Sequence, residues 1–510
     1  MKGIVRNIAV LAVICSMLAT IMSACGSSGG KASSSPSTDA SASGGASNLK
    51  PYEITMAFIT VGSQTQGIPA VQEAISKITK EKINATVKLV PISYGTWAQQ
   101  MNLMMAGDEK LDLLVSGMGT YNAQVAQGQL IPLDDLLDSS GKGITETFSP
   151  EILKATYING KIYGVPSNRD LAADYGFVMR KDLVDKYAID LTQIKTIDDL
   201  DPIFQKIRDN EPNVTPLVSY VPGSTPADSI YPMMYDYLDD KLGVLPDHDN
   251  GLKIVNLFES ENYQKVIHSI RRWYLAGFIR KDEATSKDNA TDLIKAGRAF
   301  GFFTSLKPGY EQQATRAAGT EMVSVRLSQP ITTTKNITNF MWSIAKNSKD
   351  PQRAMMFLNL MYTDKDIINL LDWGIEGEDY VKVSDNVIDY PPGKTAADVA
   401  YGLNLGWLFG NQFLSHVFKT DSPDIWQQMD AFNKGSKKSK ALGFTFDVLK
   451  VKTETAAVAN VMNQYRLGLE TGTLDPDKTF PQLNKDLKDA GIDKVIAEKQ
   501  RQLDEWAKKQ

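Results

Sequence analysis

Cysteine is nearly absent from this chain. Its 510 residues include two cysteines, Cys15 and Cys25. Residues 26–510 therefore contain no thiol, and a small secreted module braced by disulfides is excluded. A chain without these cross-links must be stabilised by buried apolar cores, which suits a large α/β protein. The roughly 460 residues that follow residue 48 predict two or more domains.

Histidine is also rare, and the motifs of common catalytic chemistries are missing. His248, His268 and His416 lie far apart, with no H-E-x-x-H zinc motif, no G-x-S-x-G nucleophile elbow and no P-loop. Gly117-Met118-Gly119 lacks the third glycine of a dinucleotide fingerprint. We therefore expect no catalytic metal, no redox group and no other cofactor, with a structural calcium ion left open.

The chain has no excess of positive charge. It contains 55 Lys and Arg residues against 60 Asp and Glu residues, which gives a formal net charge of −5. A mildly acidic surface of mixed sign does not attract a phosphate backbone, so no nucleic-acid partner is expected.

The N-terminus has the pattern of an export signal. Lys2 and Arg6 precede the apolar run Ile8–Ile21, and small residues follow. The run is too short to span a membrane comfortably. Cys25, directly after the small residues, resembles the acylated cysteine of the bacterial lipoprotein lipobox, although Met22 stands where leucine is commonest. The alternative is a plain signal peptide with a chance cysteine.

On the lipoprotein interpretation, residues 1–24 are a signal peptide that is removed. A lipid on Cys25 then anchors the chain to the cell membrane, on its extracellular side. Residues 25–48 are nearly all Ser, Gly, Ala and Thr without apolar periodicity, and they predict a flexible linker.

From Tyr52 onwards the apolar pattern alternates between strands and helices. It predicts strands over residues 54–61, 86–92 and 111–115. Residues 68–78 have helical spacing, and Thr96-x-x-Gln99 has the form of a capping box that opens a second helix. This order indicates a parallel sheet built from right-handed βαβ units.

The loops after these strands are polar, aromatic and uncharged. Ligands of open parallel sheets bind at the carboxyl ends of the strands, where the sequence places Gln64, Tyr94, Trp97, Ser116 and Tyr121. Amides and hydroxyls beside aromatic rings suit a neutral, polyhydroxylated ligand, whereas an ionic ligand would require Arg or Lys. Trp97 and Tyr121 are equally consistent with core positions.

Several segments resemble one known family. Residues 85–112, which include Trp97-x-x-Gln100-Met101-Asn102-Leu103-Met104-Met105-Ala106-Gly107, are similar to the first domain of extracellular solute-binding proteins of bacterial ABC importers. Segments 161–183 and 344–358 resemble that family's passages between lobes. Segments 373–377, 407–413 and 437–444 resemble large oligosaccharide-binding and LplA-like lipoproteins of Gram-positive bacteria.

The resemblance implies an α/β fold of the type II periplasmic-binding-protein class. Each of its two lobes would be a mainly parallel sheet flanked by helices, with the ligand cleft between the lobes. The first lobe would hold residues 49–168 with 330–370 and the second residues 169–329 with 371–510, with hinges near 167–170, 328–332 and 363–371. The implied function is that of a monomer without enzymatic activity, which captures a carbohydrate, an oligosaccharide or glycan fragment, and delivers it to ABC permease subunits.

The same resemblance adds ligand-binding candidates near the cleft. They are polar residues at the first crossing together with later tryptophans and amides: Asn168, Arg169, Asp170, Trp273, Trp342, Trp373, Trp407, Asn411 and Gln412. Trp407 and Trp273 are favoured as sugar platforms. The alternatives are a core role for each tryptophan and a structural hinge pair for Arg169 and Asp170.

Some further features concern local structure. Asp247-His-Asp-Asn-Gly251 indicates a hairpin turn with residues 253–258 as the returning strand, since its carboxylate spacing does not fit a calcium loop. Residues 196–208 and 266–278 predict amphipathic helices, and two more follow residue 481, separated by Gly491.

Two rival classes of function remain. A secreted glycoside hydrolase would also carry aromatics and carboxylates, and only the spacing of those carboxylates in the fold distinguishes it. A structural or adhesive lipoprotein would more typically contain internal repeats, and none is found in the sequence.

Overall fold

The structure is a computed structural model that describes residues 49–61, 64–107 and 109–510. The signal peptide, Cys25 and the linker predicted for residues 1–48 lie outside the described residues. Among the described helices, none has the length and hydropathy needed to cross a bilayer.

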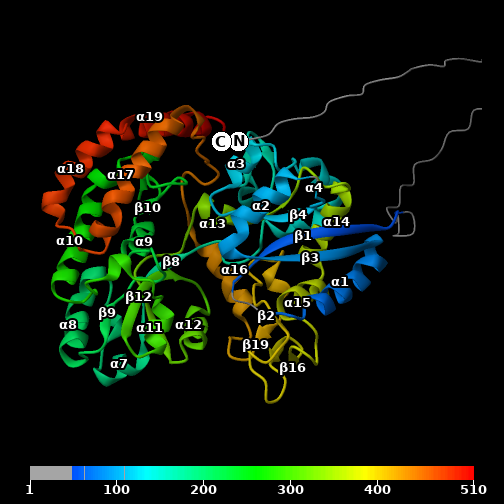
Figure 1. The fold of residues 1–510 in the computed structure, drawn as a ribbon, viewed down its shortest axis with the longest axis horizontal. Coiled ribbons are helices and arrows are strands. Elements are labelled where there is room, and N and C mark those ends of the chain that lie inside the picture. The colour runs from blue at the N-terminus through cyan, green and yellow to red at the C-terminus, as the bar shows by residue number, and fades with distance from the viewer. Residues whose placement is uncertain (1–48, 62–63, 108) are drawn as a thin grey trace, which may run out of the picture. The chain divides into compact units, whose positions relative to one another are not determined.

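A five-stranded sheet forms the first of two main sheets (Figure 1). Its order is β3 (Ala85–Ser93), β1 (Tyr52–Thr60), β4 (Leu113–Gly117), β15 (Phe340–Ile344) and β7 (Val165–Pro166). β1 is parallel to β3 and β4, and β15 is antiparallel to β4 and β7. The three predicted parallel strands are confirmed, and later segments of the chain add the antiparallel part.

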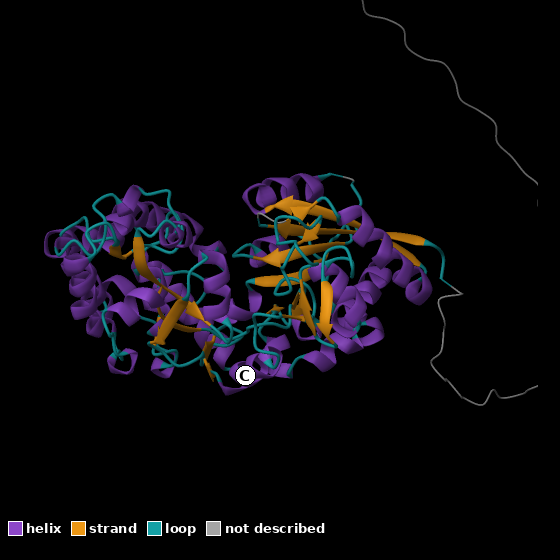
Figure 2. Cartoon of the chain, turned by 90° about the horizontal axis from the view of Figure 1, so that it is seen from below, coloured by secondary structure: helices purple, strands orange, loops and turns teal. Residues whose placement is uncertain are grey.

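Helices cover the first sheet (Figure 2). α1 (Ile68–Ile83) packs on β3 and contacts α14 (Pro351–Thr363) and α15 (Lys365–Trp373). The others here are α2 (Trp97–Ala106), α3 (Tyr121–Ala126), α4 (Asp134–Ser140), α5 (Lys142–Thr147) and α6 (Pro150–Lys154).

The capping box predicted at Thr96 does not form. A 3₁₀ turn, η2 (Tyr94–Thr96), precedes α2, so Thr96 has a nearly helical backbone with φ −111° and ψ −1°. A capping residue needs an extended backbone to reach the first free amides. The Thr96 hydroxyl instead donates to the Ser93 carbonyl at 3.2 Å.

The second main sheet has the order β13 (Met322–Arg326), β8 (Asp174–Arg180), β12 (Ala299–Leu306) and β9 (Thr215–Leu217). β8 is antiparallel to both β13 and β12, and only the β12–β9 pairing is parallel. This sheet is therefore mixed and not mainly parallel, because β8 lies between two strands that both run the other way.

The amphipathic helices predicted for the second region are confirmed. η4 (Ile197–Leu200) and α8 (Asp201–Asn210) cover residues 196–208, and α10 (Glu261–Leu275) covers most of 266–278. α18 (Pro476–Asp489) and α19 (Ile492–Ala507) are separated by Gly491, whose φ of 95° suits glycine. The remaining helices are α7 (Lys181–Lys186), α9 (Ala227–Ile230), α11 (Ala290–Lys295), α12 (Tyr310–Ala318) and α17 (Lys452–Glu470).

Short pairings complete the described structure. β2 (Gln64–Thr65) pairs with β18 (Tyr401–Gly402), and β14 (Ile331–Thr332) pairs with β20 (Lys437–Lys438). The others are β5 (Tyr157–Ile158) with β6 (Lys161–Ile162), β10 (Tyr235–Asp236) with β11 (Leu245–Pro246), and the sheet of β16 (Val381–Ser384), β17 (Val387–Asp389) and β19 (Val417–Phe418). α13 (Thr334–Thr338) and α16 (Ile425–Gly435) lie outside the sheets.

The turn predicted at residues 247–251 is present, but the returning strand is not. The turn contains η6 (Asn250–Leu252), with Gly251 at φ 57°. Within residues 253–258, Val255 alone forms a bridge, to Val244. The Asn256 side chain then accepts the Phe258 amide at 3.1 Å and starts another 3₁₀ turn, which ends the extended backbone.

Each main sheet has its own hydrophobic core. The first core contains residues from 54–171, 341–371 and 401–409, and the second contains residues from 177–325 and 441–503. The sequence assigned residues 371–410 to the second lobe, but Leu371 and the apolar residues of 401–409 pack in the first core. Phe409, for example, lies edge-on to Phe58 at a centroid distance of 5.4 Å and stacks with Trp342 at 6.1 Å. Tyr380 and Ile388 form a separate small cluster with Phe418.

The chain passes between the two sheets three times. The first two passes, residues 167–173 and 327–339, coincide with two of the expected crossings. The third crossing, expected at 363–371, is wrong, because Ile367, Ile368 and Leu371 are fully buried in the first core. The third pass runs from Gly410 to Lys440, between the last residue of the first core and Ala441 of the second.

Candidate ligand-binding site

The three passes are joined by backbone pairing. Asn168 and Asn411 form a parallel bridge in which the Asn168 amide donates to the Gly410 carbonyl at 2.7 Å and the Gln412 amide donates to the Asn168 carbonyl at 3.0 Å. The Asn168 side chain also donates to that of Asn411, at 2.8 Å. The predicted residues Asn168, Asn411 and Gln412 are therefore neighbours, although more than 240 positions separate the first from the other two.

Asn433, near the end of α16, holds the first pass through three hydrogen bonds to its backbone. Its side-chain carbonyl accepts the amides of Leu171 and Ala172 at 2.9 and 3.2 Å, and its amide group donates to the Arg169 carbonyl at 2.6 Å. The sequence did not predict this role, because a single asparagine within an amphipathic helix belongs to no motif.

A charged cluster lies on the first pass. Arg169 donates to the Asp170 carboxylate at 2.9 Å, and the Lys307 ammonium lies 3.3 Å from the other oxygen of that carboxylate. Burial opposes the charge on Asp170, but Lys307 and Arg169 outweigh it and hold the pKa of Asp170 below its ordinary value. Arg169 also donates to the Asn336 carbonyl at 3.2 Å. Both cations are thus already engaged by a carboxylate.

An aromatic pair stands beside this cluster. Trp407 meets Phe340 edge-on at a centroid distance of 4.7 Å, and the Arg169 guanidinium lies 5.7 Å from the centroid of the Phe340 ring. Both aromatic side chains are half-buried. Within the described part of the chain, the indole N–H of Trp407 donates no hydrogen bond, so both its ring and its donor can serve a ligand.

Two buried polar atoms here also have no partner within the described chain: Nε of Arg169, a donor, and Oε1 of Gln412, an acceptor. Buried polar atoms are normally satisfied, so each of these two has hydrogen-bonding capacity that the described chain leaves unused. We call the set Asn168, Arg169, Asp170, Phe340, Trp407, Asn411 and Gln412 the crossing site. Sequence reasoning missed Phe340, for which no polar or aromatic motif gives a signal.

Two of the predicted tryptophans are core residues. Trp273 is fully buried in the second core, stacks on Phe303 and donates its indole N–H to Asp201. Trp342 is fully buried in the first core and donates to the Leu408 carbonyl at 2.7 Å. Neither ring has a face left for a ligand, so the prediction that they contact one is wrong for this structure.

The residues predicted after β3 and β4 are mostly buried as well. Trp97 packs in the first core, and the hydroxyls of Ser116 and Ser343 are hydrogen-bonded at 2.6 Å. Tyr121 donates to the Thr156 carbonyl at 2.8 Å and accepts the Tyr163 amide at 3.0 Å, and burial raises the pKa of its phenol. The core alternative holds for Trp97 and Tyr121, and Ser116 is committed to a buried contact.

Three further predicted residues lie outside the crossing site, and each keeps part of its side chain exposed to solvent. Tyr94 is 58% exposed in η2, and Gln64 is half-buried in β2 opposite Gly402. Trp373 donates to the Ser415 hydroxyl at 2.9 Å and stacks with Phe418 in the small β16–β17–β19 region. Ligand contact by these three stays a prediction.

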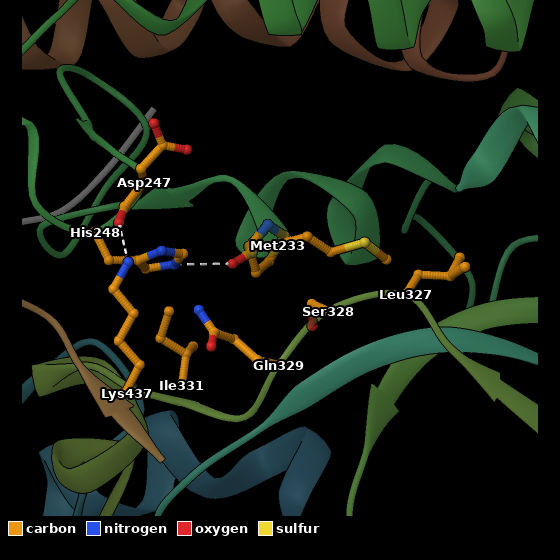
Figure 3. Close-up of a pocket in the computed structure, with 9 residues that line it drawn as sticks. Met233, Asp247, His248, Leu327, Ser328, Gln329, Ile331 and Lys437 are labelled. Carbon is orange, nitrogen blue, oxygen red and sulfur yellow. Dashed lines mark hydrogen bonds between the residues drawn. The ribbon is translucent and has the colours of Figure 1, made fainter. Parts of the chain in front are cut away.

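A separate cavity of about 340 Å³ lies on the second pass (Figure 3). It is lined by Pro232, Met233, Asp247, His248, Leu327, Ser328, Gln329, Ile331 and Lys437. None of the site residues predicted from the sequence lines it. No trio of His, Cys, Asp or Glu side chains suited to a metal ion occurs among the residues that the structure describes.

Two α/β cores connected by three adjacent passes, with aromatic and polar groups gathered at those passes, define the class of two-lobed binding proteins. The chain belongs to the bacterial extracellular solute-binding protein family, whose profile matches residues 62–367. Residues 440–508 match a domain of unknown function, DUF3502. The predicted type II fold is confirmed, and the chain is a binding protein and not an enzyme.

Relatives extend the similarity over nearly the whole chain. A carbohydrate ABC transporter substrate-binding protein of Streptococcus pneumoniae serotype 4 is 28% identical over 509 residues, 96% of each chain. The crystal structure of the N-glycan transport solute-binding protein NgtS from Streptococcus pneumoniae is 26% identical, with a TM-score of 0.81 over 90% of this chain and 99% of that one. Its complex with Man5GlcNAc gives a TM-score of 0.72 over the same shares of the two chains.

Proposed function

We propose that this chain is the substrate-binding component of an ABC importer and that it binds a carbohydrate, an oligosaccharide or glycan fragment, at the crossing site. The observation that carries the proposal is the full-length similarity to a carbohydrate ABC transporter substrate-binding protein. The similarity to NgtS, which has been solved with Man1GlcNAc and with Man5GlcNAc, makes these glycans the first ligands to test.

The chemistry of the crossing site supports a carbohydrate ligand. The open side of the Trp407–Phe340 pair can cover the apolar C–H face of a sugar ring, and the indole N–H can donate to a hydroxyl. Gln412 Oε1 can accept from a hydroxyl, and Arg169 Nε can donate to one. Because Asp170 already holds both nearby cations, hydroxyl groups suit these positions better than a second anion does.

The passes support a hinge mechanism. Ligand binding would close two lobes, and the closed state would be favoured only by the contacts that it adds. The chain's similarity to NgtS falls from a TM-score of 0.81 to 0.74 and 0.72 for the two glycan complexes at unchanged identity, so the difference is one of conformation. The cores favour a first lobe that also includes Leu371 and residues 401–409, with the second-lobe boundaries otherwise as expected from the sequence.

Lipid anchoring is part of the proposal. Cleavage before Cys25 and acylation of its thiol would tether the binding protein at the outer side of the cell membrane, beside permease subunits. Mass spectrometry of the membrane fraction should then find a mature N-terminus at a diacyl-modified Cys25. A secreted protein that still carries Ala24 would contradict the anchor while leaving the binding function intact.

Calorimetric titration tests the binding function. Purified protein should release heat with Man1GlcNAc or Man5GlcNAc, and each glycan should be recovered intact by mass spectrometry. Trp407→Ala should weaken that binding, whereas Trp426→Phe, in a half-buried tryptophan outside the crossing site, serves as the matched control. No heat with any neutral glycan would overturn the carbohydrate assignment.

A further inference from the structure

The cavity on the second pass has a buried floor and an open rim. His248 and Ile331 are buried at its base, while Met233 and Leu327 form part of its walls. Nε2 of His248 lies 3.0 Å from the Pro232 carbonyl, which can only accept, so Nε2 carries the ring proton (Figure 3). Burial lowers the pKa of His248, so the ring is neutral at pH 7.

The rim consists of exposed hydrogen-bonding side chains. Asp247, Gln329 and Lys437 are exposed, and the Lys437 ammonium donates to the Asp247 backbone carbonyl at 2.9 Å (Figure 3). An ammonium has three donors, so two remain for a ligand. The Ser328 oxygen accepts the Tyr175 amide at 2.9 Å, which leaves its hydroxyl hydrogen to donate.

This set of groups is suited to the hydroxyls of a neutral sugar. Figure 3 shows the Asp247 carboxylate pointing away from the other side chains that line the cavity, while its backbone carbonyl accepts from Lys437. The groups that face the cavity are therefore the Gln329 amide, the Ser328 hydroxyl and the free donors of Lys437, which suit hydroxyls. A volume of about 340 Å³ is at the low end of ligand pockets, which span roughly 300–1,000 Å³, and suits one sugar ring better than several. Among the described residues, no Phe, Tyr or Trp lines the cavity, so binding there would depend mainly on hydrogen bonds.

The cavity is within reach of the crossing site. Ile331 exchanges two backbone hydrogen bonds of 2.9 Å with Ala173. Ala173 is three residues after Asp170, a separation that spans at most about 11 Å of extended chain. This separation is within the length of a glycan of several sugar units.

We infer that this cavity is a second subsite that binds one neutral sugar unit of the glycan, away from the unit that contacts Trp407. The inference rests on the proposed function. Trp407 would supply apolar contact to one unit, and the side chains of Ser328, Gln329 and Lys437 would bind the hydroxyls of another. Larger glycans would thereby be distinguished from disaccharides.

Two variants and two glycans test the inference by calorimetry. Gln329→Ala removes the rim amide, and Lys437→Met removes the rim ammonium while keeping an unbranched side chain. Each substitution should lower the affinity for Man5GlcNAc about fivefold, as expected for the loss of one hydrogen bond, and should leave the affinity for Man1GlcNAc unchanged. Gln193→Ala, at an exposed glutamine elsewhere in the second region, is the control and should bind both glycans like the wild type.

The outcomes separate the inference from the proposed function. If the wild type binds both glycans and neither variant changes the affinity for Man5GlcNAc, the second subsite is overturned and the proposed function stands. Equal weakening of both glycans would also overturn it, since the cavity would then hold the disaccharide itself. If the wild type binds neither glycan, the glycan assignment fails and the subsite fails with it. A thermal melt of each variant distinguishes lost contacts from lost folding.

Discussion

Trp273 and Trp407 stand in regions that use an indole ring in opposite ways. Trp273 has Phe303 stacked on one side at 6.0 Å, Phe204 edge-on at 5.5 Å, and its N–H bound to Asp201. Trp407 has one close aromatic neighbour, Phe340, and over the described residues its N–H has no acceptor. A tryptophan whose faces and donor are all occupied stabilises the fold, whereas one with a free face and donor is available to a ligand.

The largest effect is expected when the buried ring is removed. Trp273→Ala should lower the free energy of unfolding by about 3–5 kcal/mol, because it leaves a cavity beside Phe204 and Phe303. Urea denaturation measures this loss. The affinity of the remaining folded fraction for glycan should be unchanged, and a loss of stability below about 1 kcal/mol would contradict the core assignment.

Removing the half-buried ring of Trp407 should have the reverse profile. Trp407→Ala should cost about 2 kcal/mol of binding, roughly thirtyfold in affinity, with little loss of fold stability. Calorimetric titration beside a thermal melt provides the measurement. Unchanged affinity with a collapsed melting temperature would place Trp407 with Trp273 among the core residues.

A smaller effect is expected from the neighbour of Trp407. Phe340→Leu keeps an apolar side chain but removes the edge-on ring, and should weaken glycan binding by about 1 kcal/mol, roughly fivefold. Since the two rings act as a pair, the Trp407→Ala/Phe340→Leu double variant should lose less affinity than the sum of the single losses. Strict additivity would show that Phe340 does not orient Trp407.

The smallest expected effect is a pH dependence of stability caused by Asp372, which lies against Gly406, the residue before Trp407. Asp372 is buried, accepts the Ser415 hydroxyl at 2.6 Å, and lies so close to Gly406 that a Cβ there would be 2.6 Å from its carboxylate. Burial raises the pKa of Asp372 to about 6. Because the pKa is raised in the folded state, the protonated carboxyl of Asp372 stabilises the fold. This contribution to the free energy of unfolding is complete below about pH 4 and is lost as the pH rises through about 6.

Asp372→Asn removes that titration. Relative to this variant, the wild type should lose roughly 0.7 kcal/mol of stability between pH 5.5 and 6.5. Denaturation curves at both pH values measure the difference, and other titrating groups cancel because both proteins contain them. A difference that is constant with pH would show that Asp372 does not titrate in this range.

The sequence predicted what depends on local pattern. The strands and helices of residues 52–117, the helical segment 196–208, the two helices around Gly491 and the fold class all follow from apolar spacing or from recognisable family segments. The third pass was misplaced because residues 401–409 are apolar and glycine-rich, a pattern that does not reveal which of two cores will bury them.

The site was harder to predict, because exposure is a property of the whole fold. Trp273 and Trp407 could not be told apart in the sequence, and the pairing of Asn168 with Asn411 depends on a contact across 243 positions. Asn433 acts through the backbone of the first pass, which only the fold brings to it.

The order of the two cores along the chain has a consequence for how the protein is made. The first core needs Leu408 and Phe409 as well as β1, and the second needs both β8 and the C-terminal helices α17–α19. Contacts so distant in sequence close large loops and slow folding. Neither core can be completed until most of the chain has been synthesised, so a fragment that ends before residue 400 should leave both cores unfinished, and no single cut yields two halves that fold alone.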